Sequence, residues 1–406
     1  MASPAWAAEA RETALARLES LPPLTGEEEA WRFTAPDDLA LAGPEPAAAG
    51  AGAAAPALPE GARSARLAFP DGAPSPAEAL EVPEGVVVAD LGDALSSHEA
   101  LVRERLYSLH GFEDRPGALN ASGWEAGTFV YVPRGVEVTL PVEALTSATG
   151  ARGRVLGRPQ VVVEEGARAT VIDRNASPDV DGTVHVSTTA ELFVAEGGEL
   201  EHITVIGWGA GVRHHAVVRA EARKDARVRS VVVTLGGDVV RVEPTMYVRG
   251  PGADARALGL YFAAGDQHFE HRVVARHEAP QGYSNLLYKG AIQDAAHTVF
   301  FGNLVVPPGA PGTDAYQTNR NLILNEGARA DTIPFLEIET AEVKCSHAGA
   351  VGRVDDEQLF YLAARGVPEA VAKHLIVFGF FQEVLDQIAF EDLRHELEAA
   401  VAGKVR

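Results

Sequence analysis

Between about residues 85 and 340 the sequence repeats one small pattern, in which a glycine turn precedes a short apolar run. The segments that show it best are VPRGVEV, VEEGARA, VAEGGEL, RGPGADA and LNEGARA, with Gly135, Gly166, Gly197, Gly252 and Gly327 at the turns. The first two intervals are 31 residues each, and the third, of 55 residues, has RKDARVRS (223–230) near its midpoint. Strands and turns that recur at a nearly fixed period predict a parallel β-helix, with a β-sandwich as the alternative.

The chain before this repeat divides into two parts. Residues 1–40 are expected to form a helical segment, because Ser3 and Pro4 begin a helical pattern over 4–19. In EEEAWRFT (27–34), Trp31 and Phe33 would be costly to expose, so this piece is expected to dock on the rest of the protein. Residues 41–84 are rich in Ala, Pro and Gly and are expected to be a linker, which leaves 85–345 for the β-helix core.

Residues 346–406 are expected to form a C-terminal helical region. Asp355 or Asp356 can cap a first helix, Gly366 suits its end, and Pro368 begins a second helix. That second helix is apolar around most of its circumference over 371–388, so it is expected to be buried in its own domain or under a partner. FEDLRHELEAAVAG (390–403) predicts a last helix.

The charge balance and the cysteine count limit the classes of function. The formal net charge of −22 argues against binding to nucleic acid or to an anionic membrane surface. The chain has one cysteine, no basic and apolar leader at its N-terminus, and no run of 18 apolar residues. We therefore expect a cytoplasmic protein that works with other proteins.

The single cysteine, Cys345, lies two residues before His347 in EVKCSHAGAVGR. In a strand these two side chains would share a face, so a Cys–His nucleophile or part of an iron or zinc site is open to them. No carboxylate is evident to orient the imidazole, and two ligands do not complete a metal site. A structural cysteine beside a surface histidine is the plainer interpretation, and spacing alone favours it.

Three other constellations carry weaker signals. His268, Glu270, His271 and His277 cannot all share one strand face, so a solvated sheet face is favoured over a metal centre. The adjacent pair at 214 and 215 is treated as structural for the same reason. Gln317, Asn319 and Asn321 would form a polar ladder on one face, and we assign it no catalysis. No phosphate-binding loop of the GxxxxGK[ST] type is present.

The segments YKGAIQDAAHTVFFGNLVV and QTNRNLILNEGARADTIPFLEIETAEVKCSHAGAVGRVDDEQLFYLAARG, with the apolar helix that follows, resemble the SufB/SufD family. These proteins are scaffolds of the SUF iron–sulfur cluster assembly machinery. The resemblance is dense over about 260–390 and thinner over 85–260. It implies a right-handed parallel β-helix core flanked by N- and C-terminal helical regions, with SufB and SufD pairing through their β-helices.

The resemblance also implies that the C-terminal helices bind the ATPase subunit SufC. The residues expected to contact this partner are Phe360, Tyr361, Leu375, Phe378, Phe380 and Phe381. SufB-type cores carry a sulfur-accepting cysteine well before the C-terminal block, and this chain has none there, so it resembles the SufD branch. In that branch the histidine of the CSH triplet, here His347, is implied to take part in cluster assembly and to contact iron.

The role of Cys345 is less defined by the resemblance. The family usually continues the triplet with Gly-Ala-Thr, whereas this chain has Ala348, Gly349 and Ala350, which predicts an altered local turn. We expect a non-catalytic scaffold subunit that shares a transient iron–sulfur cluster with its partner and binds no cofactor permanently. The alternatives are a purely structural or homodimeric scaffold and, less favoured, a β-helix enzyme acting on polysaccharides, for which no repeated acidic cluster is seen.

Overall fold

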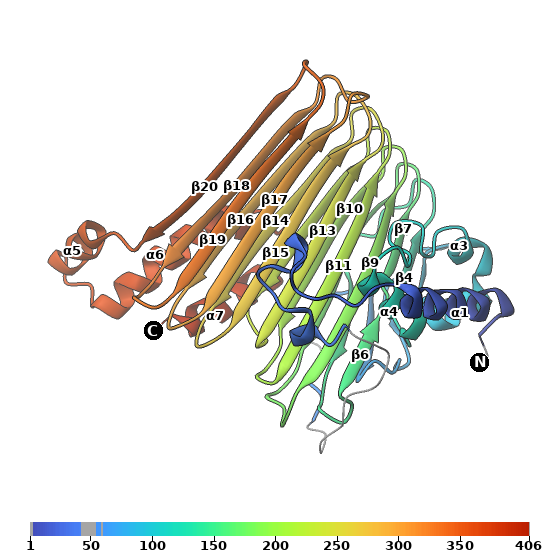
Figure 1. The fold of residues 1–406 in the computed structure, drawn as a ribbon, viewed down its shortest axis with the longest axis horizontal. Helices are drawn as coiled ribbons and strands as arrows, with labels where there is room; N and C mark the ends of the chain where they lie inside the picture. The colour runs from blue at the N-terminus through green and yellow to red at the C-terminus, as the bar shows by residue number, and fades with distance from the viewer. Residues whose placement is uncertain (1–2, 42–53, 58–59, 406) are drawn as a thin grey trace.

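The computed structural model describes residues 3–41, 54–57 and 60–405 and is dominated by two ten-stranded sheets, A and B. Consecutive strands from β7 to β20 alternate between the sheets, and nearly all neighbours are parallel, so the chain winds as a β-solenoid (Figure 1). The parallel β-helix prediction is confirmed, and the β-sandwich alternative is excluded.

Sheet A contains, in order along the chain, β1 (Ala65–Pro70), β2 (Glu78–Ala79), β5 (Val142–Ser147), β8 (Arg168–Ala176), β10 (Glu199–Gly207), β12 (Arg227–Thr234), β14 (Asp254–Ala263), β16 (Tyr283–Ile292), β18 (Asp314–Ile323) and β20 (Lys344–Arg353). Sheet B contains β3 (Val87–Asp90), β4 (Thr128–Val132), β6 (Arg154–Gly157), β7 (Gln160–Val163), β9 (Val184–Val194), β11 (Val212–Ala222), β13 (Val239–Val248), β15 (His268–His277), β17 (His297–Val306) and β19 (Arg329–Ile338).

Small and β-branched side chains fill the space between the two sheets. Alternate residues of each strand point inward and stack in columns along the solenoid, as Val228, Ala255 and Ala315 do in sheet A. Stacked columns of valine and alanine suit a narrow interior, because β-branched residues pack well on a pleated surface.

The turns of the solenoid depend on backbone conformations that glycine adopts easily. Gly135, Gly166 and Gly197 all have positive φ angles, between 64° and 71°, where the repeat places them. At the midpoint of the long interval, Asp225 takes the same left-handed conformation with φ 54°. Ion pairs link the rungs, across 28 residues from Arg227 to Glu199 and across 31 from Arg134 to Glu165.

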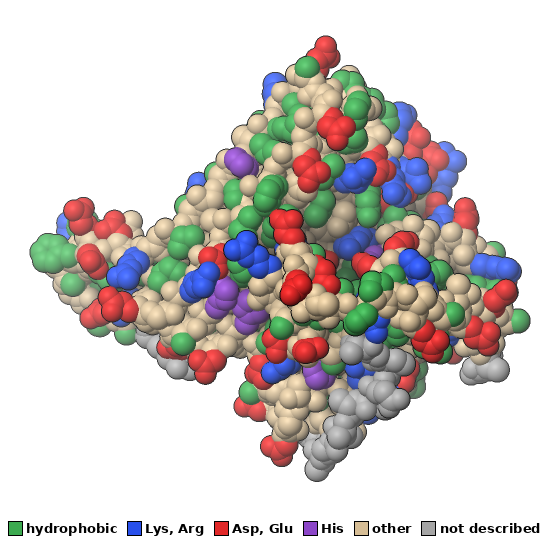
Figure 2. All heavy atoms as spheres, in the orientation of Figure 1, with side chains coloured by type: hydrophobic (Ala, Val, Ile, Leu, Met, Phe, Trp, Pro, Cys, Tyr) green, Lys and Arg blue, Asp and Glu red, His purple; other side chains and the backbone are tan. Residues whose placement is uncertain are grey.

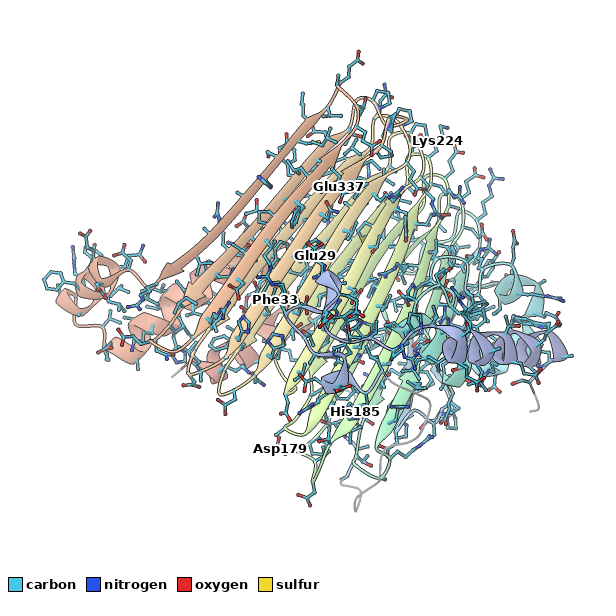
Figure 3. The ribbon with its side chains drawn as sticks, viewed as in Figure 1. Glu29, Phe33, Asp179, His185, Lys224 and Glu337 are labelled. Carbon is cyan, nitrogen blue, oxygen red and sulfur yellow. The ribbon has the colours of Figure 1, made fainter. Side chains whose placement is uncertain are left out.

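Four helices cover the outer face of sheet B near its N-terminal strands, where they pack around Phe129 of β4. These are α1 (Ala5–Ser20), α2 (Leu91–Ser97), α3 (Glu99–Arg103) and α4 (Arg115–Gly123). After α1 the chain crosses the outer face of sheet B through two 3-10 turns, η1 (Glu29–Trp31) and η2 (Pro36–Leu39), and Figure 3 shows Glu29 and Phe33 over the strands. Trp31 is 7% exposed, and its ring lies 3.9 Å from the guanidinium of Arg241. The expectation that this piece docks is met by Trp31.

The boundaries differ from those expected from composition. Residues 42–53 and 58–59 of the expected linker lie outside the described residues. β1 lies inside the expected linker and pairs with β5, so the solenoid includes residues before 85. The strand forms because the inward Leu67 and Phe69 alternate with outward residues. At the other end, β20 continues past residue 345 to Arg353.

Three helices follow the solenoid, namely α5 (Asp356–Ala364), α6 (Glu369–Leu385) and α7 (Glu391–Lys404). One face of α6 and one of α7 pack on the outer face of sheet A and make a second core, which includes Val377 and Leu397. Polar contacts fasten them: Arg174 donates to both carboxylate oxygens of Glu396 at 2.7 and 2.8 Å, and Lys404 Nζ donates to the Leu235 carbonyl at 2.6 Å. By contrast α5 has no buried residue.

Candidate functional site

The last coil of the solenoid, formed by β19 and β20, is open. Within the described residues β19 pairs only with β17, and β20 pairs only with β18, so each stands at the end of its sheet. The amide of Lys344 donates to the Thr313 carbonyl of the loop before β18, and backbone groups alternate along a strand. The backbone N–H groups of Cys345 and His347 therefore point to the open edge, where a strand of another chain can pair.

Cys345 and His347 lie on the inner face of β20, as their spacing predicts. Cys345 pairs in register with Ala315 and packs against the interior core, whereas His347 pairs with Gln317 and is exposed at the mouth of the solenoid. Residues 347–350 continue β20 without a turn, so the altered turn expected after the triplet does not form. Instead, Gly349 lies against Thr332 of β19, where a Cβ would be 3.1 Å from a methyl carbon.

The thiol of Cys345 lacks the environment of an activated nucleophile. Burial, with the nearby carboxylate of Asp314, raises the thiol pKa above its ordinary value. An activated cysteine needs the opposite shift, toward the thiolate, from a neighbouring cation. The geometry therefore disfavours a Cys–His nucleophile in this chain by itself.

A metal site is also incomplete within this chain. Among the residues that the structure describes, no three His, Cys, Asp or Glu side chains lie close enough together to hold a metal ion. The Cys345–His347 pair offers two potential ligands that share a strand face. An ion bound there would need further ligands from outside this chain.

The second group of candidate residues is dispersed by the fold. The ring of His271 points into the solenoid and stacks on Tyr261 at 4.7 Å, and burial lowers its pKa to about 3. His268 lies on the outer face under the N-terminal segment, where its Nε2 is 2.9 Å from Thr34 Oγ1, and burial lowers its pKa to about 4. His277 Nε2 is 2.8 Å from Ser284 Oγ.

The remaining members of these groups also have structural partners. Glu270 accepts hydrogen bonds from Arg241 and Thr34. His214 points inward, where the Trp208 indole donates to its Nδ1 at 3.0 Å, and His215 points outward to Glu243. The interpretation of these residues as structural is supported, with the difference that all except the half-buried His268 are buried rather than solvated.

The polar ladder at 317, 319 and 321 points into the interior of the solenoid, with all three side chains buried. Asn319 and Asn321 hydrogen-bond each other and the hydroxyl of Tyr261. The amide of Gln317 has no partner for either of its polar atoms. The common face of the ladder was predictable from sequence, but this difference between its members was not.

The expected partner-binding residues of the C-terminal helices separate into two sets. Phe360, Tyr361, Leu375 and Phe378 are exposed, at 75%, 58%, 52% and 37% respectively. Figure 2 shows hydrophobic side chains at the projecting end of the molecule where α5 lies, and a groove of about 380 Å³ separates α5 from α6 next to Tyr361 and Ile376.

The prediction for Phe381 is wrong. Its side chain is fully buried in the core between α6, α7 and sheet A, so no partner can reach it. Phe380 is half-buried, and its ring lies 5.1 Å from the ammonium of Lys289. The exposed apolar face of α6 therefore lies opposite Phe381.

None of the described helices is both long and apolar enough to span a lipid bilayer.

Comparison with known proteins identifies relatives along most of the chain. Residues 146–380 match the family model described as SUF system FeS cluster assembly, SufBD core domain. An iron–sulfur cluster assembly SufBD family protein of Mycobacterium tuberculosis is 42% identical over 297 residues, which cover 71% of this chain and 73% of that protein. The iron–sulfur cluster assembly protein SufD of Bacillus subtilis is 27% identical, with 80% and 75% covered, and SufB of the same organism is 26% identical, with 76% and 66% covered.

Proposed function

This chain belongs to the SufBD family of the SUF iron–sulfur cluster assembly system, and we propose that it acts there as a SufD-type scaffold subunit. In this proposal it pairs with a SufB-like scaffold and carries a SufC-like ATPase on its C-terminal helices. A nascent iron–sulfur cluster is built between the two scaffolds and then released. The cluster is cargo, and this chain performs no catalytic turnover of its own.

The open last coil is the observation that carries the proposal. His347 lies exposed at its mouth, beside two strands whose outer edges are unpaired in the described chain. A second β-solenoid could add its strands to these edges and so cover the mouth. His347 and Cys345 would then face the interface between the two chains.

The ligand chemistry favours a shared site. Iron–sulfur clusters are held mainly by several thiolates, and this chain has one cysteine, whose pKa is raised. Neutral imidazole is a suitable iron ligand, and a SufB-like partner would have to supply thiolate. A site divided between two chains can open when the chains move apart, which suits a cluster that must be handed on.

The C-terminal helices offer the ATPase an exposed surface, and they also pack against the solenoid. Phe360 and Tyr361 on α5, with Leu375 and Phe378 on α6, form an exposed apolar surface that suits a protein partner. The opposite side of α6 is fastened to sheet A through Lys289, which donates to the Phe380 carbonyl at 2.8 Å. Movement of an ATPase bound to α6 would therefore be transmitted to the strands of the solenoid.

Anaerobic co-purification tests this function. The chain would be co-expressed with SufB-like and SufC-like proteins, and complex composition, iron and acid-labile sulfide would be measured. We expect a complex of all three that contains iron and sulfide. Phe360→Asp and Tyr361→Asp should remove the ATPase and spare the SufB-like chain, whereas Arg134→Ala, which alters an exposed side chain away from these helices and from the last coil, should keep both.

Failure of the SufB-like chain to bind would contradict the proposal. If the chain instead forms a metal-loaded pair with a second copy of itself, the homodimeric scaffold would replace the SufD-type assignment.

A further inference from the structure

Gln317 is the inward-facing residue directly beneath His347. The two residues are partners in register on β18 and β20, so their backbones lie about 4.8 Å apart. Both side chains belong to the inner face, since Cys345 on the same strand packs on the interior core. Gln317 is 1% exposed, whereas His347 is exposed at the mouth.

The side chain of Gln317 crosses the interior to reach sheet B. Its amide lies over Gly302 of β17, where a Cβ would come within 2.5 Å of the amide nitrogen and 2.8 Å of the amide oxygen. Gly302 is therefore the residue that leaves room for the amide. In the next coil Pro334 stacks on Gly302, so the amide lies at the floor of the last coil.

Neither polar atom of the Gln317 amide has a hydrogen-bond partner in the described structure. A buried amide group left without a partner costs roughly 1–3 kcal/mol. Asn319 and Asn321, two and four residues further along the same face, have their side chains satisfied by each other and by Tyr261. Within the ladder, the amide without hydrogen-bond partners is therefore that of Gln317, the residue next to His347.

The imidazole of His347 can form a hydrogen bond with this amide. The side chain is exposed on the inner face, and no hydrogen bond to another described residue holds its ring away from Gln317. A glutamine oxygen accepts a hydrogen bond from a ring N–H and leaves the second ring nitrogen with a lone pair. Histidines that bind metals usually donate their other N–H to such an acceptor, which fixes the tautomer and the ring orientation.

We propose that Gln317 is a positioning residue for His347: its amide oxygen accepts the N–H of one ring nitrogen and so presents the other toward the mouth of the solenoid. The contact between Gln317 and His347 does not depend on the proposed function. Only its purpose, the capture of iron, rests on that function. Gln317 never touches the cargo.

The chain supplies a matched control in Gln160. This residue on β7 is also fully buried with both amide atoms unpartnered, but it pairs in register with Phe129 and Glu191, at the other end of the solenoid. Gln317→Met and Gln160→Met remove the same group at nearly constant volume. A loss that comes only from packing or stability should therefore be similar in the two variants.

The contact is tested on the isolated chain labelled with ¹⁵N-histidine. The ring signals of His347 are assigned from their absence in His347→Ala. We expect one protonated and one unprotonated ring nitrogen in the unaltered chain, a shift toward tautomer averaging in Gln317→Met, and no change in Gln160→Met. Identical His347 ring signals in Gln317→Met and the unaltered chain would overturn the proposal.

The purpose of the contact is tested in the anaerobic complex with added ferrous iron. Gln317→Met should weaken iron retention about tenfold, the lower end of what loss of such an orienting partner costs, while Gln160→Met retains it. Gln317→Glu keeps an acceptor oxygen and should recover most of the loss. If His347→Ala retains iron normally while the ring signals still respond to Gln317→Met, the proposed function fails and the positioning contact stands.

Discussion

Lys289 Nζ lies 2.6 Å from Glu383 Oε2 and joins the outer face of sheet A to helix α6. Lys289 is 5% exposed, which is rare for lysine, and it also donates to the Phe380 carbonyl at 2.8 Å. Glu383, by contrast, is half-exposed. The buried ammonium of Lys289 therefore depends on its partners in α6 more than the half-exposed carboxylate of Glu383 depends on Lys289.

Replacement of the two partners should therefore have unequal effects. Glu383→Ala leaves a buried ammonium with one remaining acceptor and should lower the free energy of unfolding by about 1–3 kcal/mol. Lys289→Met leaves a carboxylate that water can reach and should cost less. Urea denaturation measures both, with Lys373→Met as the control, because Lys373 pairs with Glu369 on α6 itself and its loss should cost less than about 1 kcal/mol. Equal effects of Glu383→Ala and Lys373→Met would contradict this account.

Stability should fall as the pH is lowered from 7 to 5.5. Burial lowers the pKa of His214 and of His271 from 6.5 to about 3, so both rings stay neutral in the folded chain while they become protonated in the unfolded chain. Their contribution is complete above pH 6.5 and is lost as the pH falls from 6.5 toward 3. At pH 5.5 each ring should cost about 1.4 kcal/mol.

Urea midpoints at the two pH values check this expectation. His271→Phe keeps a ring beside Tyr261 and should reduce the loss between pH 7 and 5.5. His395→Ala removes an exposed ring on α7 and should leave the loss unchanged. A chain that is equally stable at both pH values would show that these histidines are not buried as neutral groups.

The open edge of β20 should become protected when the partner scaffold binds. The backbone amides of Cys345 and His347 point away from β18, so they should exchange with solvent rapidly in the isolated chain. Strand addition would give them acceptors and slow their exchange by about tenfold or more, since each 1.4 kcal/mol of protection is a factor of ten. Hydrogen–deuterium exchange with fragmentation measures it, with interior β14 as the reference. Unchanged exchange of β20 in the complex would place the interface elsewhere.

Trp31 should anchor the N-terminal segment to sheet B. Its ring packs on Arg241, and the Ala30 carbonyl accepts a hydrogen bond from the same guanidinium at 2.7 Å. Trp31→Ala should cost about 3 kcal/mol and speed proteolytic cleavage within 24–41. Phe33→Ala, which alters a half-buried ring two residues away, is the control and should have a smaller effect. Equal cleavage of both variants would contradict the anchoring role.

The solenoid could be predicted from sequence because its turns require special backbone conformations. Gly166 and Gly197 recur at the turn positions with positive φ, and no helix-forming pattern separates the strands they punctuate. Asp225, Gln281 and Asp294 adopt the same conformation without being glycine, so the repeat fades where they occur. β1 was missed because two of its outward residues, Ala68 and Pro70, are apolar like the inward ones, so its sequence does not show the alternation that its burial has.

The strand face on which the site residues lie could be predicted from the sequence, but the side chains that surround them could not. The two-residue spacing of Cys345 and His347 is sufficient to place both on one face. The sequence does not show whether an apolar helix residue faces its own sheet or a partner, because α6 is apolar nearly all round. Phe381 was assigned to the wrong side for this reason. Gln317 could not be singled out, because its amide becomes buried without a hydrogen-bond partner only in the folded solenoid, where it lies over Gly302 of sheet B.

The most direct test is the iron and acid-labile sulfide content per complex when His347 is replaced by alanine. The chain, its SufB-like partner and the SufC-like ATPase are purified anaerobically with His347→Ala or with His395→Ala, the exposed control on α7. The account predicts that both complexes assemble, and that iron and sulfide fall several-fold only with His347→Ala. Equal iron and sulfide in the two complexes would contradict it and leave this chain as a structural support for its partners.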